Sequence, residues 1–245
     1  MQTQSAVFAD VPVLLRGEAG PIKSWIDELA PARLGMALVI ITVGTGLFGA
    51  AMGIWRAPLQ AVYTAIKFPL IIFLTTLGTA LLNGMLAPLL GLNLRFAQSL
   101  AAVLMSFTIF ALIVGSFSPV MLFLVWNTPP YESGASVAPY RFVQLTQVAI
   151  IAFAGVAAHI RLFQLLTRLS GSKSVAAKIL VAWLAANLFL GSQLVWILRP
   201  LIGSPGLPTQ FLRPDAFKGN FYETVFNSTI GLFSNDTRTE KGQNE

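Results

Sequence analysis

The sequence contains no cysteine, one histidine and few charged residues. Without cysteine the chain cannot form a disulfide, a thiolate metal site or a cysteine nucleophile. Charged residues make up 11% of its 245 residues, whereas soluble domains carry roughly 25%. So few charges cannot cover a surface that faces water, and this disfavours a soluble globular protein.

Acidic residues are missing from the long apolar runs, which are 34–55, 69–88, 97–117, 142–160 and 179–198. Carboxylates inside a membrane are typical of proton relays and cation pathways, so their absence argues against an ion-coupled pump. It also removes the acidic groups that metal-dependent and aspartyl hydrolases use. No nucleophile elbow, P-loop, zinc-protease or dinucleotide-binding motif is present. We therefore expect a protein that is not an enzyme.

Hydrophobic residues make up 55% of the chain, and the mean hydropathy is +0.72. About 20 apolar residues in a helix cross the hydrocarbon core of a bilayer. The run between Arg95 and Glu132 is too long for one crossing and too short for two, and proline kinks or breaks a helix. We expect 97–117 to cross and 119–127 to continue beyond Pro119 as a kinked segment. The predicted fold class is all-α, a polytopic membrane bundle of five transmembrane helices.

Two flanking segments predict amphipathic interfacial helices at both ends of the bundle. Apolar residues recur with helical spacing in 21–30 and in 220–233. Such helices lie in the membrane interface or cap the bundle. The predicted organisation is a polar N-terminal segment, a five-span bundle, an extramembrane segment and a disordered tail, at 1–32, 33–201, 202–233 and 234–245.

Small residues predict close helix packing in two runs. Thr45, Gly49 and Gly53 follow one another at four-residue spacing, which lets two helices approach closely. Their partner is either another helix of this chain or a second copy. The run 142–160 is also rich in alanine and glycine, which predicts a tightly packed central helix.

Polar side chains interrupt the apolar runs at a few positions. Asn83, Asn187 and Gln193 need partners inside the bundle or a wet cavity, because an unpaired amide in lipid is costly. We expect Pro69 to kink the chain into the second span. Lys67, just before it, is then expected at the interface, where its ammonium snorkels toward headgroups or contacts an anion.

His159 is the one candidate cofactor ligand. A histidine on a membrane helix can bind haem iron or chlorophyll magnesium, but a bis-histidine haem needs a second histidine, which this chain lacks. The alternative is an interfacial histidine bonded to a neighbouring group. We expect no metal site and otherwise no cofactor.

The segment 196–223 combines basic, proline and aromatic residues. Arg199, Arg213 and Lys218 alternate with four prolines, and Phe221 and Tyr222 follow. This composition predicts a surface that binds a partner protein or anionic lipid headgroups. The alternative is a rigid loop folded over the helix ends, with arginines near helix C-termini, where cations are favoured.

Basic residues between the runs predict the orientation. With the N-terminus in the cytoplasm, eight inner Lys and Arg stand against three in the outer short loops. This places the C-terminus on the opposite side, although the basic tail opposes that assignment. The net charge of +6 comes without a basic cluster interleaved with aromatic residues, so we expect no nucleic-acid partner.

Residues 58–200 resemble the Yip1-type family of small five-span membrane proteins. The resemblance lies in the polar N-terminus, the second and third spans joined by GLNLRFAQSL (91–100), the small-residue fourth span and the basic segment 161–178. It implies a non-enzymatic protein with a cytoplasmic N-terminus that binds partners within the membrane. It implies no functional residue.

Three functions are compatible with these features. The first is a non-catalytic membrane scaffold or accessory subunit, with the bilayer, other membrane subunits or a second copy as partners. The second is a transport or channel component for a small neutral or anionic solute, which would use Lys67, Asn83, Asn187 and Gln193 as a polar seam. The third is a pigment- or haem-binding subunit that uses His159.

Overall fold

The computed structural model describes residues 12, 30–129, 138–203 and 208–223, and these residues form helices and connecting turns without a strand. The helices are α4 (Pro31–Gly53), α5 (Pro58–Leu89), α6 (Phe96–Ser116), α7 (Ser118–Trp126), α8 (Ala138–Ser170) and α9 (Lys173–Ile197). Within the described ranges, five helical segments are long and apolar enough to cross a membrane, with α6 and α7 counted together. This agrees with the predicted all-α fold.

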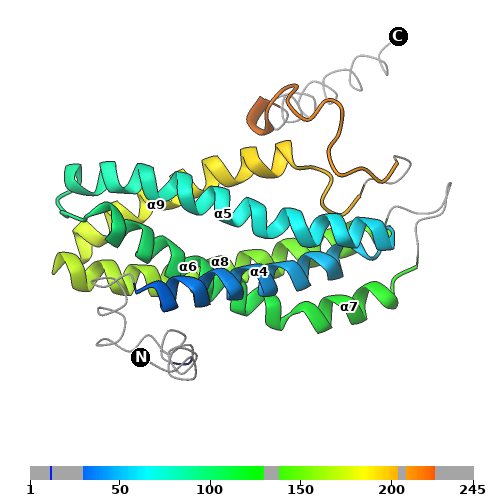
Figure 1. Cartoon of the computed structure of the whole chain (residues 1–245), viewed down its shortest axis with the longest axis horizontal. Coiled ribbons are helices and arrows are strands. Elements are labelled where there is room, and N and C mark those ends of the chain that lie inside the picture. The colour runs from blue at the N-terminus through cyan, green and yellow to red at the C-terminus, as the bar shows by residue number, and fades with distance from the viewer. Residues whose placement is uncertain (1–11, 13–29, 130–137, 204–207, 224–245) are drawn as a thin grey trace, which may run out of the picture.

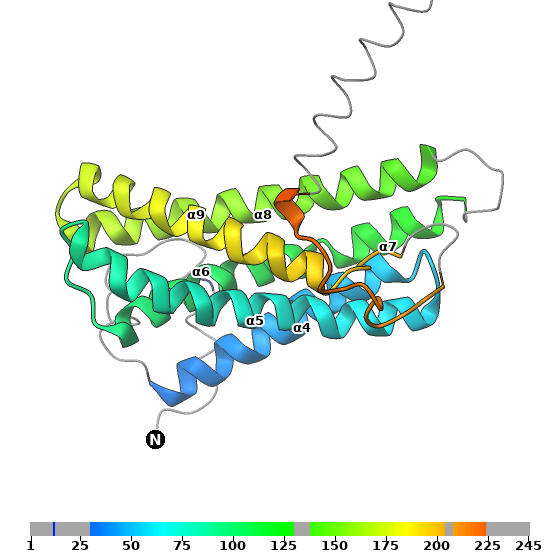
Figure 2. The ribbon, with the colours of Figure 1, turned by 90° about the horizontal axis from the view of Figure 1, so that it is seen from above.

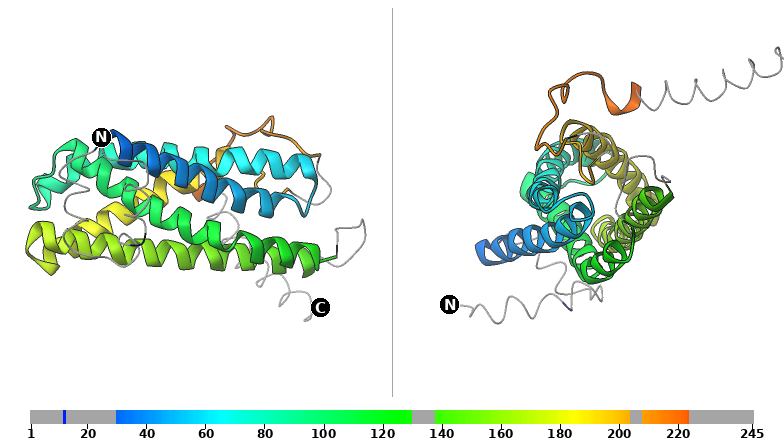
Figure 3. Two further views of the ribbon diagram at one scale, coloured as in Figure 1. Left: turned by 60° about the horizontal axis from the view of Figure 1, so that its bottom comes forward. Right: turned by 90° about the vertical axis from the view of Figure 1, so that its right-hand side faces the viewer.

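Successive helices run up and down one elongated bundle (Figure 1). The first end of the bundle holds the start of α4 and the α5–α6 and α8–α9 turns (Figure 2). The second end holds the α4–α5 turn and the C-terminus of α9. Seen end-on, the helices surround the bundle axis (Figure 3). Residues that follow α9 therefore meet residues that begin α5.

Helix α5 runs for 32 residues from Pro58 to Leu89, so the segment before Pro69 and the predicted span after it belong to one helix. Pro58 opens the helix at its first turn, where its missing amide hydrogen costs nothing. Pro69 lies inside and removes one backbone donor, yet helix continues on both sides. The residues before Pro69 thus belong to the bundle and form no separate interfacial turn.

The long apolar run is divided at Phe117, as the sequence predicts. Helix α6 ends at Ser116, and α7 begins at Ser118 with Pro119 in its first turn. Because proline has no amide hydrogen to donate to the preceding turn, it suits this restart. Most of α6 is buried, which makes α6 the central helix of the bundle.

Glycines bring α4 against α5 and α6, which confirms the predicted small-residue contact and places its partner inside the chain. A Cβ added to Gly49 would lie 2.6 Å from the Thr64 carbonyl oxygen, and one added to Gly53 would lie 2.5 Å from that of Gln60. Thr45 is buried beside them, and its hydroxyl donates to the Ile41 carbonyl at 2.6 Å. The two helix backbones are therefore in direct contact.

Helix α8 lies on the outside of the bundle, so the predicted central position of this small-residue span is wrong. Nothing lies within 4 Å of a Cβ added to Gly155, and Val156 is 61% exposed. The turn from α8 to α9 falls at Gly171 and Ser172, and the Ser172 hydroxyl accepts the Val175 amide at 3.5 Å. Because Gly155 and Val156 face outward, the small residues of α8 do not bring other helices close on every side of it.

Several predicted segments lie outside the described residues. These are the interfacial helix at 21–30, apart from its last residue, and the tail 234–245. Of the predicted helix at 220–233, the described part is helical at residues 221–223.

Candidate functional site

A stripe of polar side chains runs along one face of α5. Its members are spaced by three, four or eight residues and are all buried: Gln60, Thr64, Lys67, Thr75, Thr79 and Asn83. Such a stripe cannot face lipid, because unpaired polar groups in hydrocarbon are costly. It faces α9 and the residues that follow α9.

Lys67 is fully buried at the second end of the bundle, so its ammonium contacts the chain itself and does not extend toward headgroups as predicted. Its Nζ donates to the Pro200 carbonyl at 2.9 Å and lies 5.0 Å from the centre of the Phe211 ring. Carbonyls that follow a helix have no acceptor role within it and need external donors. Lys67 supplies such a donor, which attaches the loop after α9 to α5.

Gln60 and Thr64 strengthen the same attachment. The Gln60 side-chain amide donates to the carbonyls of Pro200 and Leu201 at 3.1 and 3.0 Å. The Thr64 hydroxyl lies within hydrogen-bonding distance of the Leu201 and Gln60 carbonyls and donates to one of them at a time. The two carbonyls are thus held by three side chains of α5.

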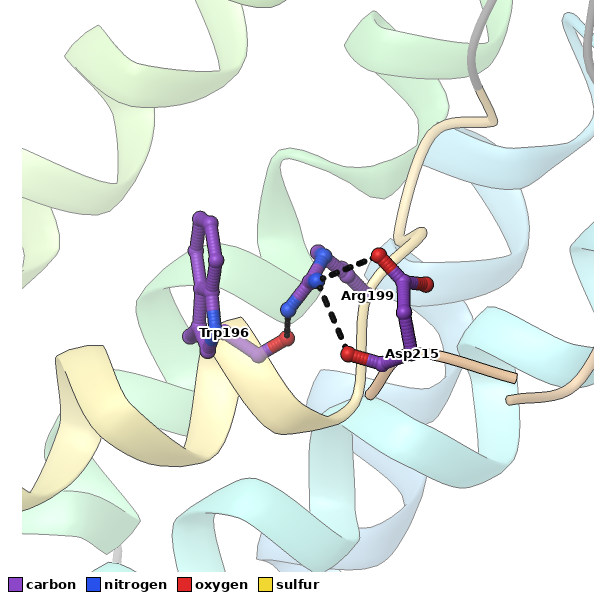
Figure 4. Close-up of polar contacts among 3 residues, drawn as sticks. All are labelled: Trp196, Arg199 and Asp215. Carbon is purple, nitrogen blue, oxygen red and sulfur yellow. Dashed lines mark hydrogen bonds and ion pairs between the residues drawn. The ribbon is translucent and has the colours of Figure 1, made fainter. Parts of the chain in front are cut away.

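Arg199 is held between the end of α9 and a later part of the loop (Figure 4). Its guanidinium stacks 3.7 Å from the centre of the Trp196 ring and donates to the Trp196 carbonyl at 2.7 Å. It also donates to the backbone and carboxylate oxygens of Asp215, each at 3.3 Å. Of the two interpretations of segment 196–223, Arg199 therefore fits a cation at a helix C-terminus.

A pocket of about 450 Å³ lies between α8, α9 and this loop. Apolar side chains and polar groups share its lining, which comprises Met52, Phe68, Gln144, Gln147, Val148, Ile151, Val195, residues 199–203 and Arg213. Helix α8 ends and α9 begins at the first end, and the two helices separate toward the second end, where the pocket lies (Figures 1 and 2). Among the described lining residues are two arginines and no carboxylate.

Gln147 is the distinctive polar group of this pocket. It is 1% exposed, and neither its amide nitrogen nor its amide oxygen has a hydrogen-bond partner in the described part of the chain. A buried amide without partners costs about 1–3 kcal/mol. Gln147 therefore needs a partner, and the pocket that it lines is where a ligand can supply one.

Sequence reasoning did not single out Gln144 or Gln147. A signal was present, because two glutamines three residues apart share one face in the first third of this helix. The pocket adds Arg199 and Arg213, which the sequence did mark as binding candidates. The structure thus brings two predicted arginines together with two unpredicted glutamines.

The first-end part of the stripe is only partly paired. The Thr79 hydroxyl donates to the Asn187 side-chain oxygen at 2.7 Å, and a Cβ added to Gly191 would lie 3.9 Å from the Thr75 hydroxyl. This antiparallel register places Asn83 at the level of Trp183. Asn83 and the Trp183 indole nitrogen are buried without partners among the described residues.

The residues predicted to form a polar seam lie partly along the α5–α9 contact. Asn187 bonds to Thr79 there, Asn83 lies one turn further along α5, and Lys67 lies at the second end of the contact. Gln193 is half-buried on α9. The seam is a helix contact with one direct side-chain hydrogen bond, and the pocket beside Gln147 lies apart from it.

His159 is half-buried on α8 and bonded within its own helix. Its Nδ1 lies 2.7 Å from the Gly155 carbonyl, which can only accept, so Nδ1 carries the proton. Its Nε2 is buried without a partner in the described chain. The described residues contain no group of three or more histidine and acidic side chains that could hold a metal ion. The proposed role of His159 as a cofactor ligand stays a prediction.

The remaining docking candidates lie after the loop. Tyr222 stacks on Phe189 at 5.5 Å, and its hydroxyl accepts from Ser192 at 2.9 Å. Phe221 makes an edge contact with Tyr222 at 5.4 Å, and Lys218 is exposed. Tyr222 thus fastens this segment to the outer face of α9.

No protein-family model, no curated protein and no solved structure matches this chain. The resemblance to the Yip1-type family therefore stays a prediction. The geometry and chemistry of the pocket are the basis for assigning a function.

Proposed function

We propose that this chain is a multi-pass integral membrane protein, without catalytic activity, that binds an anionic group in the pocket between α8 and α9. Five segments of sufficient length and hydropathy support the membrane assignment. Many large apolar side chains on the outer faces of these helices are exposed, which is costly in water and favourable in lipid.

The observation that carries the binding assignment is the unpaired Gln147 amide in a pocket that Arg199 and Arg213 also line. Guanidinium groups match the planar geometry of phosphate and carboxylate oxygens. An amide nitrogen can donate to the same anion, while the amide oxygen accepts from a hydroxyl group. This combination suits an anion that also carries a hydroxyl or ester group.

The lining supports binding more than catalysis. None of the described residues that line the pocket is Asp, Glu, His or Lys. The pocket therefore offers hydrogen-bond donors to an anion but none of these usual general acids or bases. The nearby carboxylate of Asp215 is paired with Arg199.

Thermal unfolding in mild detergent tests this function. The probes are glycerol 3-phosphate and phosphatidic acid in mixed micelles, which carry the same phosphomonoester. Binding to the folded state raises its stability by about 2.7 kcal/mol at a ligand concentration of 100 Kd, and we expect a higher Tm with at least one probe. Gln147→Leu should lose this response. No response to either probe, or an equal response in the variant, contradicts the proposal.

A scaffold or accessory subunit is the second candidate. Its first support is weakened, because Gly49 and Gly53 contact α5 of the same chain and are therefore not available to another protein. Its remaining support is the segment after the loop, where Phe217 is 78% exposed beside exposed Lys218. A protein that runs as a monomer in mild detergent, with no partner after gentle extraction, contradicts this candidate.

A transport component could use the same pocket as its binding site. Binding measurements alone do not separate a transporter from a binding protein. Uptake of glycerol 3-phosphate into liposomes that contain the purified protein separates them, because only transport accumulates the anion inside.

A further inference from the structure

We infer that the anion bound in this pocket is the phosphate headgroup of an anionic glycerophospholipid, which enters sideways between α8 and α9. The inference rests on the proposed function and specifies its ligand. Three independent features of the pocket support a lipid over a water-soluble anion: its mouth, its depth and its charge.

The mouth of the pocket is apolar and opens on the outer face of the bundle. Val148 on α8 is 57% exposed and Val195 on α9 is 38% exposed, and both line the pocket. Behind them lie Phe68 and Met52, which are buried. A water-soluble anion gains nothing from such walls, whereas acyl chains are stabilised by contact with them.

Tryptophans place the pocket at headgroup depth. Trp55 lies in the turn after α4, Trp126 ends α7 and Trp196 lies in the last turn of α9, all at the second end of the bundle. Trp126 is 74% exposed. Because tryptophan side chains gather where hydrocarbon meets headgroups, these three mark one membrane interface. The pocket is lined by Arg199, three residues after Trp196, and therefore opens at that level.

The charge around the pocket suits one phosphate. Arg199 and Arg213 line it, and the buried ammonium of Lys67 lies behind the Pro200 carbonyl. Asp215 is paired with Arg199, is 54% exposed and does not line this pocket. The positive charges thus exceed the negative ones, while Gln147 adds a neutral donor and acceptor. The volume of the pocket, about 450 Å³, lies within the usual range for small-ligand sites, about 300–1,000 Å³.

Two pairs of variants test the inference in nanodiscs of phosphatidylcholine with and without phosphatidic acid. Gln147→Leu removes the unpaired amide and keeps the side-chain size, and Val148→Trp fills the mouth at an exposed position. Their controls are Asn83→Leu, another buried unpaired amide far from the pocket, and Val156→Trp, another exposed valine of α8. The readout is phosphatidic acid retained on the protein in native mass spectrometry, with Tm as a check on folding.

We expect the wild type and both controls to retain phosphatidic acid. Gln147→Leu should lose affinity about tenfold, the effect of one lost charge-assisted contact, and Val148→Trp should lose affinity because its ring blocks the mouth. Without phosphatidic acid, Gln147→Leu should fold with an unchanged or higher Tm. Equal loss in the controls, or equal retention in all variants, overturns the inference.

A soluble competitor separates the inference from the function on which it rests. If glycerol 3-phosphate raises the Tm of wild type while phosphatidic acid is not retained, the site binds a soluble anion and the lipid inference is wrong. If neither probe binds, the proposed function fails as well. If phosphatidic acid and phosphatidylcholine are retained equally, the pocket binds lipids without selecting anionic headgroups, and the inference is again wrong.

Discussion

The two faces of α5 use opposite means of contact. Toward α4, glycines bring backbone against backbone, and the nearest groups to Gly49 and Gly53 are carbonyls. Toward α9 and the loop after it, α5 presents polar side chains that bond to carbonyls and to Asn187. In lipid there is no hydrophobic drive between helices, so close packing and interhelical hydrogen bonds hold them together. This one helix uses both.

The comparison predicts different sensitivities. On the glycine face, any added side-chain atom should lower the stability, because it would meet backbone atoms. On the polar face, a substitution should lower the stability where the side chain is hydrogen-bonded, and an apolar replacement should be tolerated where it is not. Four sets of substitutions test this, from the largest expected effect to the smallest.

Gly53→Val should have the largest effect. Its side chain would meet the backbone of Gln60 and Ala61, which cannot move without separating α4 from α5. We expect a loss of about 3 kcal/mol or more, at the upper end for overpacking. Gly35→Val on the same helix is the control, because nothing lies within 4 Å of that position. Thermal unfolding in detergent measures both, and similar Tm values for the two variants would refute the close contact.

Lys67→Met should follow. It removes the donor to the Pro200 carbonyl and leaves that carbonyl with Gln60, at a cost of about 1–3 kcal/mol. The loop after α9 should also become more accessible to limited proteolysis. Lys178→Met, at an exposed position of α9, is the matched control. Unchanged proteolysis in Lys67→Met would show that the loop does not depend on this ammonium.

Thr79→Val and Asn187→Leu should show a smaller, shared effect. Each single change leaves the other polar group unpaired, at about 1 kcal/mol, while the double variant removes both. The double-mutant cycle should therefore give a coupling energy above about 0.5 kcal/mol. Strictly additive losses would mean that the two side chains do not bond in the folded protein.

Asn83→Leu should have the smallest effect, with an unchanged or higher Tm. Its amide is buried without partners in the described chain, so an apolar side chain of similar size removes a cost and no bond. A loss as large as that of Thr79→Val would contradict this and would indicate that water or a ligand bonds to the amide.

The sequence predicts the number of membrane-length helices and the division near Pro119. These follow from the length of apolar runs and from proline and glycine chemistry. It also predicts the close contact of Gly49 and Gly53, because small residues at four-residue spacing share one helix face. All of these features are local in the chain.

The sequence does not predict which face of each helix is inside. In a soluble helix the apolar face marks the core, but in lipid both the core and the surroundings are apolar. Helix α8 was misplaced for this reason. Lys67 was misplaced because its partner, Pro200, is 133 residues away, and no local pattern reports such a contact. The position of Gln147 in a pocket likewise could not be predicted, because residues of other helices and of the loop after α9 form the rest of its lining.

The lengths of α5 and α8 have a consequence for where such a protein can reside. At 1.5 Å per residue their 32 and 33 residues extend for about 50 Å, against roughly 30 Å of hydrocarbon. The excess has to be met by tilt, by projection into water or by a locally thicker bilayer. In a membrane, the mismatch between helix length and bilayer thickness would then favour thick bilayers over thin ones for this protein, independently of any binding partner.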